Sequence, residues 1–346
     1  MNRNNDLVQY FAMQQPNLLQ KLAWQATTLD EDRAWRNKFR RRLRRLVGRM
    51  PRQVPLQVEY AEEMETDAFI RRKIYIQSEA YYWVPAYLFL PKPLPQSAPA
   101  LVCLHGHSGI YPYIREGNEA ELAKSRTLEL DYAPYFAEQG YVTIAPIQRG
   151  WNETANSVDD KESGCQRMVT NSFLSGMTPI GLRCWDASRL VDFLQTQAMV
   201  DPKRIGVAGL SGGGTVALFW AALERRLRLA IVAGYYCTFA DSIYAIRHCP
   251  CNVVPNMLEW GEMRDIAALI APRPLLIIYG KQDPIFPIAA SRRAYAELEV
   301  VYDLLDAPEM LEKDFFDGPH AWSNRKTLPF LKQNFKGCLL YTSPSP

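Results

Sequence analysis

The sequence predicts an α/β fold: a mostly parallel central sheet with helices on both faces, preceded by an N-terminal helical segment. Apolar runs typical of buried strands alternate with helix-forming runs along the chain, as they do in sheets built from strand–helix–strand units. The chain has 346 residues, of which 48% are hydrophobic, enough for one sizeable domain with an appendage. We expect residues 1–54 to form the helical segment and residues 55–336 the main domain.

The N-terminal segment contains a strongly basic amphipathic helix. Thr28 and Glu31 are spaced as a capping box, and an apolar stripe follows at helical spacing. Five arginines are expected largely on the opposite face: Arg36, Arg40, Arg41, Arg44 and Arg45. Such a helix could bind RNA or a membrane. A docked helix with a solvated basic face fits better, because the formal net charge of the chain is only +3.

The main domain is expected to open with an antiparallel hairpin formed by residues 71–76 and 83–90. The later strands are expected at residues 99–104, 141–147, 204–208, 229–235, 274–280 and 300–305. The intervening helices are expected at residues 132–139, 182–195 and 215–223. Two connections, at about 148–181 and 236–265, are long enough to shape a substrate site.

One turn carries the strongest functional pattern of the chain. Gly209-Leu210-Ser211-Gly212-Gly213 fits G-x-S-x-G and lies between a strand-like run and a helix-forming run. A strand, a sharp glycine-flanked turn at a serine and a helix are typical of a nucleophile elbow. The turn requires a positive φ at the serine, so its neighbours must be nearly free of side chains. The alternative is a glycine-rich turn without chemistry, since neither a P-loop nor a dinucleotide-binding fingerprint fits.

Ser211 needs a base and an acid, and candidates for both follow it along the chain. His320 lies on a late loop, from which it could reach a serine at the edge of the sheet. Asp283 follows a strand-like run, and active-site groups of parallel sheets gather at the carboxyl ends of strands. Asp303 and Asp306 are the rival acids. We expect His320 to take the serine proton and Asp283 to fix the tautomer of the imidazole.

The loop after the strand at residues 99–104 is expected to complete the site. It reads His105-Gly106-His107-Ser108-Gly109, and we assign the oxyanion hole to the backbone N–H groups of Gly212 and His107. The alternative is a metal bound by His105 and His107. Zinc normally takes three or four protein ligands, and no Cys, Asp or Glu lies close to this pair in sequence. We therefore expect no metal and no cofactor.

The seven cysteines are scattered without a pattern, which indicates reduced thiols and a cytoplasmic protein. Cys249-Pro250-Cys251 is too closely spaced for an ordinary metal-binding pair, and a disulfide-like pair is the other interpretation. The neighbouring His248 is interpreted as a loop or lid residue. No run reaches the roughly 18 apolar residues of a membrane span, and the N-terminus lacks the apolar core of a signal peptide. Residues 337–346 change abruptly in character and are expected to be a non-native tail.

Four residues on the two long connections are candidates for substrate contacts: Arg149, Trp151, Tyr236 and Trp260. Plain packing beneath the loops is an equally good interpretation of the aromatic side chains. The expected partner is a small-molecule ester, with no nucleic acid and no membrane, and a homo-oligomer stays open.

The chain resembles the dienelactone-hydrolase-like and acetyl-xylan-esterase-like bacterial α/β-hydrolases, from Thr28 to about Phe335. The matching pieces are residues 35–48, 83–88 and 105–109, Arg149-Gly150, residues 209–214 and 271–274, Asp283-Pro284 and His320. The resemblance implies an α/β-hydrolase fold and a serine esterase, with Arg149-Gly150 steadying the site. An intracellular enzyme acting on small acetyl-type esters, such as acetylated sugars, fits it best.

Two other functions share the elbow. A serine peptidase of the prolyl-oligopeptidase kind usually carries a propeller domain, for which this chain has no room. A non-catalytic protein on the same scaffold would often have lost one member of the triad, whereas all three candidates are present here.

Overall fold

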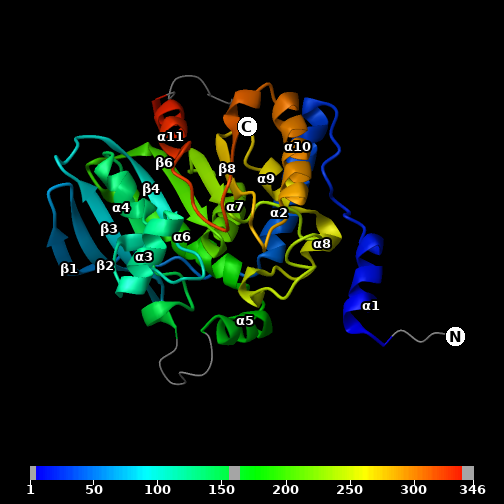
Figure 1. Ribbon diagram of the computed structural model, residues 1–346, viewed down its shortest axis with the longest axis horizontal. Helices are drawn as coiled ribbons and strands as arrows, with labels where there is room; N and C mark the ends of the chain where they lie inside the picture. The colour runs from blue at the N-terminus through cyan, green and yellow to red at the C-terminus, as the bar shows by residue number, and fades with distance from the viewer. Residues whose placement is uncertain (1–4, 156–163, 337–346) are drawn as a thin grey trace.

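A computed structural model describes residues 5–155 and 164–336 (Figure 1). Its strands are β1 (Val58–Glu65), β2 (Phe69–Glu79), β3 (Tyr82–Pro91), β4 (Ala98–Leu104), β5 (Val142–Pro146), β6 (Val200–Leu210), β7 (Leu229–Ala233), β8 (Leu275–Gly280) and β9 (Leu311–Phe316). Within the described residues they form one nine-stranded sheet in the order β1-β2-β3-β5-β4-β6-β7-β8-β9. β1, β2, β3 and β5 pair antiparallel in turn, and every later pair is parallel. The expected mostly parallel sheet is confirmed.

Helices cover both faces of this sheet. They are α1 (Leu7–Gln14), α2 (Leu29–Leu46), α3 (Glu119–Leu128), α4 (Tyr132–Glu138), α5 (Gly164–Leu174), α6 (Pro179–Thr196), α7 (Gly212–Leu223), α8 (Met257–Trp260), α9 (Met263–Ala268), α10 (Ile288–Leu304) and α11 (Thr327–Lys336). Apolar residues of α2, α6, α7, α9 and α10 pack on one face, and those of α4 and α11 pack on the other. Among the helices described, none combines the length and the apolar character needed to cross a membrane.

Alternation along the strands produces these two layers of core. In β4, Val102 and Leu104 face the cluster that contains α7, whereas Leu101 and Cys103 face the cluster that contains α4. Successive side chains of a strand point to opposite faces, so a strand buried on both sides must be apolar throughout. Because β4, β6, β7 and β8 pair parallel, their carboxyl ends lie at one edge of the sheet, where the loops that follow them are brought together.

The basic helix α2 shares the core of the main domain rather than forming a separate unit. Phe39, Leu43 and Val47 are fully buried in the same cluster as α6 and α7. Thr28 and Glu31 form the expected capping box. The apolar stripe was correctly predicted from its spacing of about 3.6 residues, because residues at that spacing lie on one face of a helix and are buried together.

The expectation of a fully solvated basic face on α2 is wrong for two arginines. The guanidinium of Arg36 donates to the carbonyl of Ala271 at 2.7 Å, and that of Arg40 donates to the carbonyl of Leu269 at 3.4 Å. These long side chains reach across to the main domain and satisfy carbonyl groups near the end of α9. The other three, Arg41, Arg44 and Arg45, are exposed as expected.

Two elements of the structure differ from the sequence prediction. Residues 300–305, expected as a strand, contain the last turn of α10, and the edge strand is β9 instead. Leu298 and Val301 are buried at helical spacing, while Asp303 is exposed. A six-residue apolar run does not distinguish a strand from the end of a longer helix. β1 was also missed, because it is glutamate-rich and almost wholly exposed at the opposite edge.

Replacing Phe39 with alanine tests whether α2 belongs to the core. The ring is fully buried and stacks on Trp35, with 5.1 Å between the ring centroids. We expect Phe39→Ala to lower the free energy of unfolding by about 3–5 kcal/mol, measured by urea denaturation. Lys38→Ala, at an exposed position of the same helix, should change it by no more than about 0.5 kcal/mol. Equal effects of the two substitutions would contradict the shared core.

Candidate active site

The turn between β6 and α7 has the strained geometry of a nucleophile elbow. Ser211 follows the last residue of β6 and precedes the first residue of α7, with φ 58° and ψ −119°. Its backbone N–H donates to the carbonyl of Ala233 at 2.9 Å. A Cβ atom on Gly213 would lie 1.9 Å from the carbonyl oxygen of Leu104, so no side chain fits there. The serine is thereby held at the N-terminal end of α7, where free N–H groups favour negative charge.

An aspartate and a histidine from two later loops meet beside this turn. His320 Nδ1 lies 2.6 Å from Asp283 Oδ2. The other carboxylate oxygen, Oδ1, accepts the backbone N–H groups of Ile285 at 2.8 Å and Phe286 at 3.2 Å. Because the carboxylate accepts from Nδ1–H, the imidazole is held with its Nε2 lone pair free. The rival acids do not share this position: Asp303 is exposed on α10, and Asp306 lies in the exposed turn after it.

Ser211 and His320 line one cavity of about 320 Å³. His320 Nε2 is buried and has no hydrogen-bond partner among the described residues. No hydrogen bond between Nε2 and Ser211 Oγ is formed within the described ranges. In unliganded hydrolases this contact is often long and tightens when substrate binds. The arrangement therefore places a histidine with a free ring nitrogen and a strained serine in the wall of the same cavity.

His107 and Gly212 are the sequence-predicted oxyanion donors. Gly212 is the first residue of α7, and the N–H groups of a helix's first turn have no acceptor within the helix. His107 lines the cavity together with Ser211, and its ring Nδ1 would lie 2.8 Å from a Cβ atom placed on Gly212. The ring of His107 therefore lies beside the backbone of Gly212 at the start of α7, and the role of the two backbone N–H groups stays a prediction.

A metal held jointly by His105 and His107 is incompatible with this geometry. His105 Nε2 accepts the backbone N–H of Gln148 at 3.0 Å, and its Nδ1 lies 2.8 Å from the carbonyl of Gly106. Burial lowers the pKa of His105 to about 3, so the ring is neutral with both nitrogens occupied. No cysteine is close to His107 in sequence, but in the fold three cysteine sulfurs lie within 4.8 Å of one of its ring nitrogens.

Arg149 lies in a buried ion-pair network behind the site rather than in the cavity. Its guanidinium donates to the two carboxylate oxygens of Asp186 at 2.7 and 2.8 Å and to Glu79 at 2.7 Å. The same group lies over the ring of Tyr82, with 3.8 Å to the ring centroid. Arg149 thus connects the β2–β3 hairpin to α6. Its position agrees with a steadying role and not with a substrate contact.

The three aromatic candidates for substrate contacts also lie outside the cavity lining. Trp151 packs edge-on against the ring of His107, with 5.0 Å between centroids. Tyr236 is fully buried, and its hydroxyl donates to the carbonyl of Ala294 at 2.7 Å. The guanidinium of Arg42 lies over the ring of Trp260, with 3.5 Å from its carbon to the ring centroid. Packing beneath the loops was the correct alternative for Tyr236 and Trp260.

Several residues of the cavity were not anticipated from the sequence. Lys124 from α3 and Arg247 line it with exposed cationic side chains, and Ile246 and Ile285 supply apolar surface. His248 also lines it and lies in the connection after β7, as expected of a loop histidine. No local sequence pattern marks Lys124 as a cavity residue, because it lines the same cavity as Ser211 only through the position of α3 in the fold.

The chain matches the Abhydrolase family over residues 15–329. It belongs to that family. The chain is also similar to YtaP of Bacillus subtilis (strain 168), whose name describes a hydrolase. YtaP is 27% identical over 280 residues, which cover 77% of this chain and 88% of YtaP.

Solved structures of esterases share the fold. A candidate acetyl xylan esterase from Bacteroides fragilis NCTC 9343 superposes with a TM-score of 0.74 at 15% identity, covering 91% of this chain and 83% of that one. A glucuronoyl esterase from Solibacter usitatus gives 0.66 at 17% identity, with 91% and 96% covered. An acetyl xylan esterase from Paenibacillus sp. R4 gives 0.59 at 21% identity, with 93% and 99% covered. At these identities the likeness establishes the α/β-hydrolase fold of this Abhydrolase family member.

Removing the Arg149 guanidinium tests its structural role. Arg149→Ala leaves the buried carboxylate of Asp186 without its partner, which typically costs about 3–5 kcal/mol of folding free energy. We expect a loss of that size in chemical denaturation. Arg225→Ala, at an exposed position, should change stability by at most about 0.5 kcal/mol. If Arg149→Ala kept the stability of the parent chain, the network would not hold the hairpin to α6.

Proposed function

We propose that this Abhydrolase family member is a serine carboxylic-ester hydrolase that works through an acyl-enzyme. One observation carries the proposal: Ser211, in its strained turn, lines the same cavity as His320, whose Nδ1 is bonded to Asp283 and whose Nε2 is free. A nucleophile, a base and an orienting carboxylate are the parts that acyl transfer needs. The esterase names of its structural neighbours support the same chemistry.

The acylation half-reaction follows from these positions. Ser211 Oγ attacks the carbonyl carbon of the ester while His320 Nε2 takes the hydroxyl proton. The carbonyl oxygen becomes an oxyanion, which accepts the backbone N–H groups of Gly212 and His107. The C–O bond to the alcohol then breaks, and the leaving oxygen takes the proton from His320. Asp283 stabilises the transient imidazolium without itself taking the proton.

Deacylation repeats the same steps with water. A water molecule gives a proton to His320 Nε2 and attacks the acyl carbonyl of the Ser211 ester. The second tetrahedral intermediate uses the same two N–H donors. Its collapse breaks the bond to Ser211 Oγ, which recovers the proton from His320 and releases the carboxylic acid.

We propose small acyl esters, of the acetyl type, as the substrate class, with acetylated sugars as the leading example. A cavity of about 320 Å³ lies at the small end of the range that ligand sites occupy. Apolar surface from Ile246 and Ile285 suits a short acyl chain, and the exposed cations Lys124 and Arg247 suit an oxygen-rich alcohol. The acetyl xylan esterase names of two structural neighbours agree with this class.

We place the enzyme in a reducing compartment, the cytoplasm. None of the six cysteines of the described residues is paired in a disulfide, and five of them are buried. Proteins of oxidising compartments usually pair their cysteines as disulfides.

Covalent labelling tests the nucleophile. A fluorophosphonate probe should react with the purified protein, and mass spectrometry of the peptides should locate the adduct on Ser211. The Ser211→Ala variant should not be labelled. Its kcat for 4-nitrophenyl acetate should fall by at least about 10⁴-fold, because the nucleophile acts as part of one unit.

The matched control is Ser175→Ala, which removes an exposed hydroxyl at the end of α5 and should keep full activity. Longer nitrophenyl esters should be poorer substrates than the acetate if the cavity limits the acyl chain. A folded protein that is not labelled would instead support a non-catalytic scaffold. Preferential cleavage of peptides would support the peptidase alternative.

A pair of aspartate substitutions tests the acid. Asp283→Asn replaces the acceptor of His320 Nδ1–H with an amide that can donate, which favours the wrong tautomer of the imidazole. We expect kcat to fall by about 10⁴-fold. Asp306→Asn should leave kcat unchanged, because Asp306 is exposed and asparagine tolerates its φ of 53°. The reverse result would assign the acid to Asp306.

A further inference from the structure

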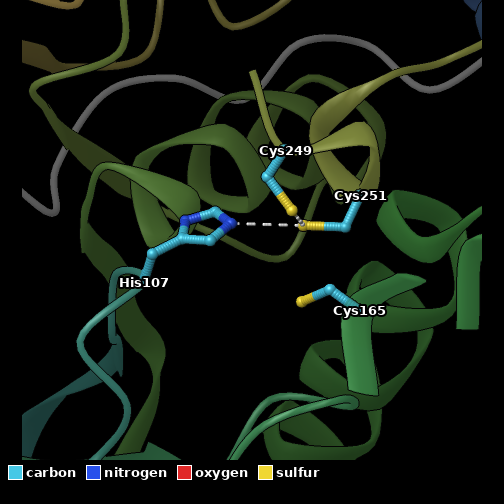
Figure 2. A group of neighbouring side chains, drawn as sticks. All are labelled: His107, Cys165, Cys249 and Cys251. Carbon is cyan, nitrogen blue, oxygen red and sulfur yellow. Dashed lines mark hydrogen bonds between the residues drawn. The ribbon is translucent and has the colours of Figure 1, made fainter. Parts of the chain in front are cut away.

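A cluster of one imidazole and three thiols lies at the wall of the cavity (Figure 2). His107, Cys165, Cys249 and Cys251 offer four ligand atoms that all lie within 4.8 Å of one another. His107 Nε2 is 3.3 Å from the sulfur of Cys251, and the sulfurs of Cys249 and Cys251 are 3.2 Å apart. Figure 2 shows the imidazole and the three sulfurs turned toward a common centre.

The spacing of these atoms suits a tetrahedral zinc ion. In a tetrahedral site, Zn–S bonds are about 2.3 Å and Zn–N bonds about 2.0 Å long. Two sulfur ligands then lie about 3.8 Å apart, and a nitrogen ligand lies about 3.5 Å from a sulfur. Shifts of about 1 Å or less would bring the observed atoms to these separations. Three cysteines and one histidine form one of the usual closed structural zinc sets. Thiolate ligands disfavour Mg²⁺ and Ca²⁺, which prefer oxygen.

A buried arginine supplies an independent electrostatic observation. Arg183 on α6 is only 3% exposed, and its guanidinium contacts the sulfurs of Cys251 at 3.4 Å and Cys165 at 3.6 Å. Its other polar partner among the described residues is the carbonyl of Arg149, at 2.8 Å. A guanidinium removed from water needs a counter-charge. Zn²⁺ with three thiolates and a neutral imidazole has a net charge of −1, which Arg183 balances, whereas three neutral thiols would not.

The four side chains come from three segments that are distant in sequence. His107 lies on the loop after β4, and Cys165 lies in the first turn of α5. Cys249 and Cys251 flank Pro250 in the connection after β7. Buried cysteines can form a small apolar cluster under loops, and Cys165, Val169 and Cys251 do pack in this way. Apolar packing alone does not account for an imidazole nitrogen and a guanidinium directed at the sulfurs.

We propose that His107, Cys165, Cys249 and Cys251 bind one Zn²⁺ as a structural Cys₃His site. The ion cross-links the loop after β4, helix α5 and the connection after β7, three segments that lie outside the sheet. With Nε2 of His107 on the metal, its ring proton lies on Nδ1, on the side of the ring that faces Gly212. The metal then also holds the His107 backbone N–H beside the elbow. This positioning role rests on the proposed esterase function, whereas metal binding itself does not.

Metal content of the full chain is the primary test. The protein is expressed with zinc in the medium, purified under reducing conditions without chelators, and measured by inductively coupled plasma mass spectrometry. We expect about one zinc per chain. Replacing zinc with Co²⁺ should give the intense d–d absorption of a tetrahedral ion together with thiolate-to-cobalt charge-transfer bands. Both measurements use the unaltered sequence, so neither depends on a variant that folds.

Substitutions then assign the ligands. Cys165→Ala and Cys251→Ala should each reduce bound zinc to less than about a tenth of the parent value, because a structural site needs all four ligands. Cys184→Ala is the matched control, since it removes a buried thiol of α6 that lies outside the cluster. It should retain full zinc content and the cobalt spectrum.

Three results would overturn the site. They are a folded parent chain without zinc, titration of all cluster thiols as free thiols in the native protein, and a Cys249–Cys251 disulfide in its mass spectrum. The metal content also separates this proposal from the esterase assignment. A zinc-loaded chain that hydrolyses no ester would defeat the proposed function alone. An active chain without zinc would defeat the metal site alone.

Discussion

The close approach of α7 to the ends of β4 and β6 is the constraint on which the site depends. A Cβ atom on Gly213 would lie 1.9 Å from the carbonyl oxygen of Leu104, and one on Gly209 would lie 2.3 Å from the carbonyl oxygen of Gly213. With no side chain possible at either position, the helix starts directly on the sheet edge. Ser211 must then turn the chain at φ 58°, which exposes its hydroxyl to the cavity at the N-terminus of the helix.

The groups around Ser211 are held by contacts that differ in kind. Two backbone N–H groups of its own loop hold the Asp283 carboxylate, which in turn lies against His320 Nδ1. His107 has no comparable support from the sheet. Its ring is fixed from outside, by the edge of Trp151 and by the sulfurs of the cysteine cluster. The position of Asp283 therefore depends on one short loop, whereas the position of His107 depends on the long connections that pack against it.

This division also explains what the sequence could predict. Ser211, Asp283 and His320 could be proposed from the sequence because each has a local signal: a glycine-flanked turn, the end of an apolar strand and a late loop. The structure places Asp283 and His320 in contact and leaves Asp303 on an exposed helix face. For Tyr236 and Trp260 both alternatives stayed open, because a sequence does not tell whether an aromatic residue on a long connection faces a cavity or the core. The approach of Cys165 to Cys251 was hidden for the same reason, since 86 residues separate them and no local spacing marks the pair.

A crystal structure of the protein after reaction with a small phosphonate ester would test the central claim most directly. We expect a covalent bond from phosphorus to Ser211 Oγ. The phosphonyl oxygen should lie within hydrogen-bond distance of the backbone N–H groups of Gly212 and His107, with His320 Nε2 facing the serine oxygen. An adduct on another residue, or a phosphonyl oxygen that contacts neither N–H group, would contradict the assignment of this turn as the catalytic centre.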